Sequence, residues 1–472
     1  MTLESFRSFS ADRAPGSAPL PVQIAAEVRR LITTGALRPG DAIPSSRAVA
    51  GDLGVSRGSV TAAYDQLTAE GYLVARPRSA TRISSDLTLL TQPPRPGPPP
   101  SSPRTTLPTI SFLPGHEPTG PLADDPTWRA SWRDAVRRTP TLDPLGEPAL
   151  RQAIAQHLRL SRAMVVDPGS IAVTSGARAG LGLLLNVVGS SVPADPRSRL
   201  PRVAVESPGF PGLRRLLTQV GVDVVPVPVG ADGFHRASLN DAHSARPVDL
   251  VLVTPNHQYP LGGALPARAR QELIAWARAN ASLLVEDDYD AEYRHLGPPL
   301  PPLWQLDPDV VAHLGTFSSV LSPAVATGYL VVPERLRPAV VAAKAALGAT
   351  VSPLAQLALA RYLDEGGLRK RLGRARRRLA AARAEAAALL PELGEHGQVQ
   401  DTGHLLVIET PPLVAARWRE AAAAKGLLVG DLADGWAGGS PRAGIVVDYG
   451  GHEPARVRRA LRLLATAAPR TP

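Results

Sequence analysis

The apolar positions of the first eighty residues follow three short helical patterns separated by turns. From Leu20, large apolar side chains recur every three or four residues, which predicts a first helix. A second helix opens at Ser45 and ends at Gly54, and a third is capped by Ser56 and stops at Gly71. The short turn between the second and third helices is typical of a helix-turn-helix.

Residues 72–83 predict two short strands around Arg76-Pro77-Arg78-Ser79, which is the pattern of a wing. Residues 1–19 before this module indicate a flexible tail. Residues 84–109 contain QPPRPGPPPSSP, which holds too many prolines for packed structure and indicates a semi-rigid spacer. The pattern therefore predicts a winged helix-turn-helix over residues 20–83, joined by a Pro-rich linker to the rest of the chain.

From residue 110 onward, helical and strand patterns alternate. Continuous Val/Leu strands between helices favour an α/β domain with a mainly parallel sheet covered on both faces. We expect this effector domain over residues 110–472, with a large part at about 150–345 and a small part at about 346–472 that begins with long helices. The expected strands are 171–174, 203–206, 222–227, 250–254, 282–286, 310–314, 328–332, 405–409 and 444–448. The expected helices of the large part are 148–162, 178–188, 211–220 and 267–280.

Composition limits the classes of function. The 472 residues carry a formal net charge of +10, but residues 1–83 hold ten arginines and seven acidic residues, so charge alone is weak evidence for DNA. The absence of cysteine excludes disulfides and zinc–thiolate sites. No apolar run approaches the roughly 18–20 residues that cross a bilayer, and the N-terminus has no apolar signal segment. We therefore expect a cytoplasmic protein with no membrane partner.

Several polar side chains of the N-terminal module stand where a winged helix-turn-helix contacts double-stranded DNA. The first turns of the third helix face the major groove, and the free N–H groups at the start of the second helix suit a phosphate. Wing arginines reach the backbone or the minor groove. A helical interaction domain with ordinary caps is the alternative. The candidate DNA-binding residues are Ser45, Ser46, Arg47, Arg57, Ser59, Thr61, Arg76, Arg78 and Arg82.

The segment PGDAIPSSRAVAGDLGVSRGSVTAAYDQLTAEGYLVAR closely resembles the winged helix-turn-helix of the GntR family of bacterial transcription regulators. This resemblance covers nearly the whole module and implies binding to a DNA operator. The wing differs, because RPRSATRI stands where the family usually has a Gly-Ser-Gly-Thr turn.

Three strand ends in the second half carry groups that suit a flat, cationic, phosphorylated ring. Gly176-Ala177-Arg178 joins a strand to a helix and offers backbone amides to an anion. Phe210 offers an aromatic face, and Asp287 lies in a carboxylate cluster after a buried strand, where a cationic or hydrogen-bonding partner is needed. Pyridoxal phosphate has the matching shape. For the carboxylates, a Mg²⁺ or Ca²⁺ site or a solvated turn is the alternative.

The segments TPNHQYP, VEDDYDAEYRH, GTFSSVLSP and TGYLV, with ISFLPGHEP and LDPLGEPALRQAIAQHL before them, are similar in order and spacing to the aminotransferase-like domain of the MocR subfamily of GntR regulators. The likeness implies a fold-type-I aminotransferase architecture, pyridoxal phosphate, a small-molecule effector and a head-to-tail homodimer. It places Asp287 at the pyridine nitrogen, Tyr289 at the ring hydroxyl and Phe210 on the ring face. Around the phosphate it places Gly176, Ala177, Arg178, Thr316 and Ser318.

The chain departs from the MocR pattern where the cofactor would be attached. The motif normally reads Gly-Thr-Phe-Ser-Lys, but Ser319 occupies the position of the Schiff-base lysine, and a hydroxyl forms no Schiff base. Ala326 replaces a phosphate-binding arginine and removes a contact of roughly 1.5–3 kcal/mol. The last strand also lacks the carboxylate-binding arginine of aminotransferases. We therefore assign no catalytic residue, and we expect pyridoxal phosphate to be non-covalent at best, or absent.

Two interpretations of this pocket stay open. In the first, mutational drift has abolished ligand binding. In the second, the pocket is retained for a ligand, which is free pyridoxal phosphate, a preformed adduct with an amino acid, or an unrelated metabolite. We expect a DNA-binding transcription regulator that senses a small molecule. The alternative is an aminotransferase, or a lysine-free enzyme using the same cofactor, with an appended DNA-binding module. No metal ligand is assigned. The arginine-rich run over residues 369–378 has the spacing of a solvated helix face, with Leu372 and Leu379 inward, rather than that of a second DNA site.

Overall fold

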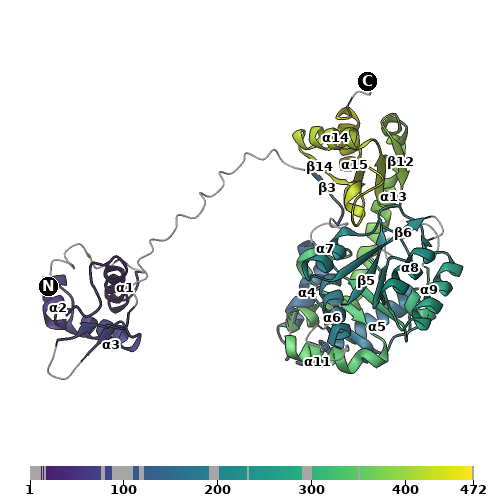
Figure 1. Cartoon of the computed structure of the whole chain (residues 1–472). Helices are drawn as coiled ribbons and strands as arrows, with labels where there is room; N and C mark the ends of the chain where they lie inside the picture. The colour runs from purple at the N-terminus through teal and green to yellow at the C-terminus, as the bar shows by residue number, and fades with distance from the viewer. Residues whose placement is uncertain are drawn as a thin grey trace. The chain divides into compact units, whose positions relative to one another are not determined.

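A computed structural model gives the structure of residues 12, 14, 17–75, 80–87, 110–115, 122–190, 201–230, 233–289, 300–348 and 351–469. The chain forms two compact units, residues 1–105 and residues 106–472. Figure 1 shows the helices and strands of each unit, which are described separately below.

The first unit is a three-helix domain with a two-stranded wing. Its elements are α1 (Leu20–Thr33), α2 (Ser46–Leu53), α3 (Arg57–Ala69), β1 (Leu73–Val74) and β2 (Arg82–Ile83). Ile24 and Val28 of α1 pack with Val60 and Leu67 of α3 in a core from which water is almost excluded. β1 and β2 pair in antiparallel orientation, as expected for a wing.

The helix-turn-helix has the caps that the sequence predicted. The Ser45 hydroxyl accepts a hydrogen bond from the backbone N–H of Ala48 at the start of α2. Gly54 ends that helix in the left-handed conformation, with a φ of 60° that suits a residue without a Cβ. Ser56 then accepts from the N–H of Ser59 and caps α3. The predictions for this turn are confirmed.

An eight-stranded sheet forms the centre of the second unit. Its strand order is β4-β11-β10-β9-β8-β5-β6-β7. The pairs from β10 through β9, β8 and β5 to β6 are parallel, whereas β11 and β7 are antiparallel to their neighbours. The strands are β4 (Ile171–Thr174), β5 (Arg202–Ser207), β6 (Asp223–Gly230), β7 (Gly233–Phe234), β8 (Leu250–Val253), β9 (Leu283–Asp287), β10 (Val311–Thr316) and β11 (Gly328–Val331).

Helices cover both faces of this sheet because its strands are apolar on both sides. Val203 and Val205 of β5 face α6 (Ala177–Ser190), α7 (Pro211–Gln219) and α11 (Arg337–Leu347). Ala204, between them, faces the opposite cluster under α8 (Arg236–Ala245), α9 (Ala267–Ala279) and α10 (Leu303–Leu306). The predicted mainly parallel α/β fold is confirmed, with boundaries that differ from the predicted ones by up to three residues.

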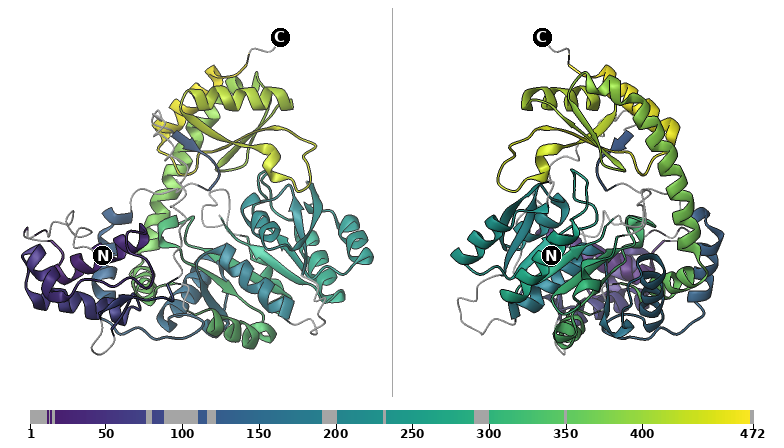
Figure 2. Two further views of the ribbon diagram at one scale, coloured as in Figure 1. Left: turned by 60° about the vertical axis from the view of Figure 1, so that its left-hand side comes forward. Right: turned by 90° about the vertical axis from the view of Figure 1, so that its right-hand side faces the viewer.

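A second sheet of five strands has the order β12-β13-β15-β14-β3. Its strands are β12 (Gln398–Asp401), β13 (Leu405–Glu409), β14 (Leu427–Asp431), β15 (Gly444–Asp448) and β3 (Ile110–Phe112), and its helices are α14 (Pro412–Ala424) and α15 (Pro454–Thr466). The long helix α13 (Gly367–Gly394) runs from the eight-stranded sheet to this second sheet (Figure 2). Leu372 and Leu379 of α13 are buried, as expected, while most of its arginine-rich run is exposed.

β3 was not among the predicted strands. It pairs in parallel with β14, more than 300 residues away, so the segment that follows the linker is an edge strand of the C-terminal sheet. Further helices α4 (Pro126–Ala135), α5 (Pro148–Arg162) and α12 (Pro353–Asp364) pack together beside the eight-stranded sheet.

Candidate functional site

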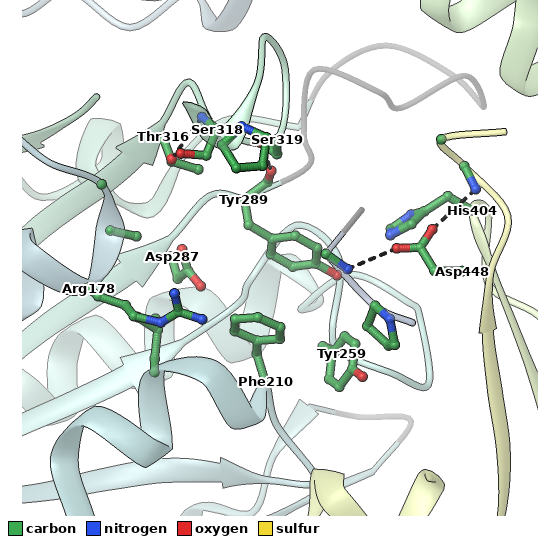
Figure 3. A pocket seen from close by; sticks show the side chains of 18 of the residues that line it. Arg178, Phe210, Tyr259, Asp287, Tyr289, Thr316, Ser318, Ser319, His404 and Asp448 are labelled. Carbon is green, nitrogen blue, oxygen red and sulfur yellow. Dashed lines mark hydrogen bonds between the residues drawn. The ribbon is translucent and has the colours of Figure 1, made fainter. Parts of the chain in front are cut away.

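A cavity of about 390 Å³ opens at the carboxyl ends of β4, β5, β8, β9 and β10, and we call it the central cavity. Its wall on the side of the eight-stranded sheet includes Arg178, Phe210, Asp287 and Ser319 (Figure 3). Residues from β13 and β15 of the five-stranded sheet form the opposite wall. Open α/β sheets bind ligands at this edge, and the volume suits a small molecule.

The loop between β4 and α6 provides backbone donors to the central cavity. Gly176 has a φ of 118°, and its carbonyl accepts a hydrogen bond from the Thr174 hydroxyl. A Cβ on Gly328 of β11 would lie 2.8 Å from the Cα of Gly176, so the loop rests directly on that strand. The helix that begins at Ala177 therefore directs its free N–H groups to the same place as the turn after β10.

That turn carries the hydroxyls that the sequence singled out. The Thr316 hydroxyl accepts from the N–H of Ser318. The Ser319 hydroxyl donates to the backbone carbonyl of Tyr289, at 2.9 Å, and thereby ties the turn to the end of β9. Ala326 precedes β11 with a φ of 44° and an exposed side chain. Thr316, Ser318, Ser319 and Ala326 all line the central cavity.

Two aromatic rings lie between the cavity walls. The rings of Phe210 and Tyr289 are nearly parallel, with centroids 6.4 Å apart. The Tyr289 hydroxyl is 3.2 Å from Nδ1 of His257, and Tyr259 meets Phe210 edge-on. Gly212 lets the ring of Phe210 and the guanidinium of Arg178 approach α7, because a Cβ there would lie 2.9 Å from Nη2 of Arg178.

The three successive carboxylates at the end of β9 have different surroundings. Glu286 is fully buried and accepts from the imidazole of His313 and the N–H of Leu303. Burial raises the pKa of Glu286, but the hydrogen bonds from His313 and Leu303 and the positive charges of His313 and Arg162 together outweigh it and hold the pKa below its usual value. Asp288 pairs with Arg162, and burial raises its pKa against that pairing. Asp287 alone of the three lines the central cavity.

This separation argues against a shared metal site, because the carboxylates do not converge on one point. Among the described residues, no group of three His, Cys, Asp or Glu side chains is arranged to hold a metal ion.

The structure adds cavity residues that the sequence did not indicate. Gly115, after β3, and His404 and Asp448, from the five-stranded sheet, line the central cavity. The carboxylate of Asp448 accepts hydrogen bonds from the N–H groups of Gly115 and Gly450. The position of Asp448 at the carboxyl end of a predicted strand was a usable signal, but its neighbour Gly115 is 333 residues away.

None of the three lysines of the chain appears among the described residues that line the central cavity. Lys344 is buried and donates to the backbone carbonyl of Val173, and burial lowers its pKa. Lys425 donates to the carbonyl of Thr466 in the C-terminal helix. Lys370 is exposed on α13.

The candidate DNA-binding residues of the first unit cluster at two helix starts and the wing. Arg47, Arg57 and Thr61 are exposed, as is Ser45. Ser46 and Ser59 are half-buried, and the hydroxyl of Ser59 lies 2.8 Å from that of Ser56. Arg82 is exposed and donates to the carbonyl of Gly40, which anchors the wing. Arg76 and Arg78 lie outside the described residues.

Comparison with known proteins bears on both units. The model of the family "Bacterial regulatory proteins, gntR family" matches residues 20–83, and that of "Aminotransferase class I and II" matches residues 126–431. The HTH-type pyridoxine biosynthesis transcriptional regulator PdxR of Corynebacterium glutamicum is 41% identical over 95% of this chain and 96% of its own length. The probable rhizopine catabolism regulatory protein MocR of Rhizobium meliloti is 31% identical over 95% of this chain and 94% of its own length.

The chain belongs to the MocR type of GntR-family regulators. This MocR-type protein is a transcription regulator that binds DNA through its winged unit and carries an aminotransferase-like domain for a small-molecule ligand.

Solved structures show the fold of that domain. An archaeal alanine:glyoxylate aminotransferase has a TM-score of 0.66 at 21% identity, over 76% of this chain and 90% of its own. The α-aminoadipate aminotransferase LysN of Thermus thermophilus, complexed with N-(5'-phosphopyridoxyl)-L-leucine, has a TM-score of 0.65 at 23% identity, over 76% and 92%. The aminotransferase-like domain of this MocR-type regulator therefore has the fold of these aminotransferases.

The residues around the central cavity fit that cofactor in part. A buried carboxylate, two aromatic rings and a glycine loop at a helix start match a phosphorylated pyridine. An amine for covalent attachment is missing from the described lining residues. Among the described residues, no helix is long and apolar enough to cross a membrane.

Proposed function

We propose that this regulator senses pyridoxal phosphate, or a close phosphopyridine relative, held in the central cavity by non-covalent contacts alone. In this proposal Ser319 stands where related domains carry the attaching lysine. The observation that carries it is the combination of a buried carboxylate and two aromatic rings in the lining with the absence of lysine from the described part of that lining. The engagement of Lys344 with a buried backbone carbonyl supports it, because that amine is already used in packing.

The proposal gives each lining residue a role. Asp287 would hold the pyridine nitrogen as a cation, and Tyr289 would hydrogen-bond the ring hydroxyl. Phe210 would cover one ring face. When bound, the cofactor supplies an electron-poor ring and an aldehyde. The phosphate would be held by Arg178, by the backbone amides of Gly176 and Ala177, and by the hydroxyls of Thr316 and Ser318.

Asp287 is suited to this role because its carboxylate is buried at a strand end and lines the central cavity, where a pyridinium beside it would gain a favourable charge interaction. Arg178 is partly held by its hydrogen bond to the carbonyl of Gly212, which directs the guanidinium along the cavity wall. In this proposal, Arg178 would bind an anionic group of the ligand and Asp287 would bind a cationic one.

Loss of the covalent bond suits a sensor. With Ala326 in place of an arginine, the phosphate loses a contact of roughly 1.5–3 kcal/mol, or about tenfold or more in affinity. The occupancy of the cavity then follows the free ligand concentration. Such a ligand changes DNA binding only if it binds two arrangements of the protein unequally.

We propose that the DNA-binding residues are those at the starts of α2 and α3 and on the wing, and that residues 20–83 form the DNA-binding domain. The 41% identity with a pyridoxine biosynthesis regulator supports a target gene in that pathway.

A head-to-tail homodimer is the proposed assembly. Large exposed apolar side chains such as Leu142 and Leu160 support a further protein contact.

The test is a spectroscopic and mass measurement on the full chain with added pyridoxal phosphate. We expect a saturable absorbance change that dialysis reverses, and an unchanged protein mass after borohydride treatment. Asp287→Asn is the matched variant, and it should lower the affinity at least tenfold. Thermal unfolding of this variant without ligand controls for a loss of stability. A borohydride-fixed adduct on one lysine would contradict the proposal.

A further inference from the structure

The charged groups of the central cavity are distributed unevenly between its two ends. Arg178 is the only arginine or lysine among the described lining residues, and it lies on the wall formed by α6 and α7. Asp448 lies on the opposite wall, with the rings of Phe210 and Tyr289 between them (Figure 3). A ligand that fills the cavity would therefore present an anion at one end and meet a carboxylate at the other.

Asp448 is built into its wall and is not a mobile surface group. It ends β15, the central strand that pairs with both β13 and β14, and only 5% of its surface is exposed. One carboxylate oxygen accepts from the N–H of Gly115 at 3.0 Å, and the other accepts from the N–H of Gly450 at 3.2 Å. These contacts hold the carboxylate at the cavity edge.

The hydrogen bonds to Asp448 also occupy two backbone N–H groups that could otherwise bind an anionic group of a ligand. Two backbone N–H groups that donate to the two oxygens of one carboxylate are also suitable donors for a ligand carboxylate. Here the protein's own carboxylate already accepts from both, and it adds a negative charge. An entering carboxylate would lose these donors and meet a like charge in a partly desolvated place.

We infer that Asp448 restricts the effector to phosphopyridines that carry no amino-acid carboxylate, and favours those with an amine on the ring. This inference rests on the proposed function, because it concerns the ligand of the same cavity. A pocket that attaches its cofactor through a lysine needs the aldehyde form. This cavity has no such need, so pyridoxamine phosphate, whose ammonium suits Asp448, becomes a ligand in its own right.

The direct test is a set of calorimetric titrations of the wild-type full chain with two matched probes. N-(5'-phosphopyridoxyl)-L-alanine carries the amino-acid carboxylate, and N-(5'-phosphopyridoxyl)ethylamine differs only by lacking it. We expect the ethylamine compound to bind at least tenfold more tightly. Pyridoxamine phosphate should also bind at least threefold more tightly than pyridoxine phosphate, which has a hydroxyl instead of the amine.

The Asp448→Asn variant keeps a hydrogen-bond acceptor and removes the charge. It should reduce both affinity ratios at least threefold, whereas Asp287→Asn should weaken all four probes and leave the ratio of the alanine to the ethylamine compound within twofold. If Asp448→Asn fails to fold, the wild-type ratios still decide the question.

The outcomes separate the two proposals. Equal or tighter binding of the alanine compound by the wild-type protein would overturn the role of Asp448 while the proposed sensor function stands. If no phosphopyridine, pyridoxal phosphate included, binds at up to millimolar concentration, the proposed function itself fails.

Discussion

Glu206 is a buried carboxyl group at the end of β5, beside the cavity-lining segment that contains Phe210. It accepts hydrogen bonds from the backbone N–H and the hydroxyl of Thr254. Burial raises its pKa from 4.5 to about 7, although the Thr254 hydrogen bonds oppose the rise. The folded protein therefore holds this proton more tightly than the unfolded chain does.

Because the pKa of Glu206 is higher in the folded protein than in the unfolded chain, the stability of the protein depends on pH. The contribution of Glu206 is fully present below pH 4.5 and is lost as the pH rises through about 7, and its size is on the order of 3 kcal/mol. Glu206→Gln should match the wild type in denaturant unfolding near pH 5 and be more stable than it near pH 8. A stability difference that is the same at both pH values would show that Glu206 does not titrate in this way.

Gly212 affects ligand binding because its lack of a side chain leaves room for two cavity residues. A Cβ at this position would collide with the ring of Phe210 and lie 2.9 Å from Nη2 of Arg178. Gly212→Ala should therefore displace both side chains and lower the affinity for pyridoxal phosphate at least tenfold in calorimetry. The collision should also lower the free energy of unfolding, by roughly 1–3 kcal/mol less the gain of about 1 kcal/mol from alanine in a helix. Gly182→Ala in α6 is the control, since its Cβ meets open space and ligand affinity should stay unchanged.

Sequence patterns identified Asp287 but not Asp448 as a cavity residue. Asp287 follows a strongly apolar strand and belongs to a recognisable local segment. Asp448 matters because of a contact with the N–H of Gly115, and neither residue is informative without the fold that brings them together. Nor did spacing show that Glu286 and Asp288 turn away from Asp287 toward His313 and Arg162.

At the level of secondary-structure elements, variants in the turn after β10 can test whether Ser319 occupies the position of the attaching lysine. Ser319→Lys combined with Ala326→Arg should allow borohydride to fix pyridoxal phosphate to the protein, detected as one mass increment located at residue 319. The physical reason is that the amine would reach into a cavity whose other walls are intact. Ser319→Met, similar in length but without an amine, is the control and should gain no increment. A double variant that binds the cofactor but gains none would refute the assignment of Ser319.

The long periodic elements could be predicted from the sequence, because their apolar spacing reflects burial on a helix face or in a sheet. α5 and β4 have the boundaries that the pattern indicated. β3 was not predictable in this way, since it has only three residues and forms by pairing with β14 across most of the chain. Short edge strands carry little local signal, and their partners are set by tertiary packing.

β3 and the residues after it are anchored beside the central cavity. Phe112 is fully buried and stacks on His452 with ring centroids 4.0 Å apart, while Gly115, three residues on, donates to Asp448. The first residues of the second unit therefore contribute directly to the cavity wall.

At the scale of the whole molecule, DNA recognition should divide between two kinds of contact. Arg57 begins α3, whose first turn faces the major groove in this class, so Arg57→Ala should cost about 1–3 kcal/mol and relax sequence preference. Arg47→Ala should weaken binding to all DNA sequences. It should also reduce the salt dependence of the affinity by the amount that roughly one phosphate contact contributes. Arg30→Ala on α1, where Arg30 pairs with Glu27, is the control. Fluorescence anisotropy over a range of salt concentrations would measure these effects, and equal behaviour of all three variants would contradict the assignment.

Control of DNA binding by a non-covalently bound phosphopyridine can be measured on the full chain. Fluorescence anisotropy would follow binding of the full chain to the promoter DNA beside its own coding sequence, with and without saturating pyridoxal phosphate. We predict sequence-selective binding whose affinity changes at least fivefold with the ligand, returns after dialysis, and is insensitive to the ligand in Asp287→Asn. Selective DNA binding that pyridoxal phosphate and pyridoxamine phosphate both leave unchanged, or a change that dialysis does not reverse, would contradict the account.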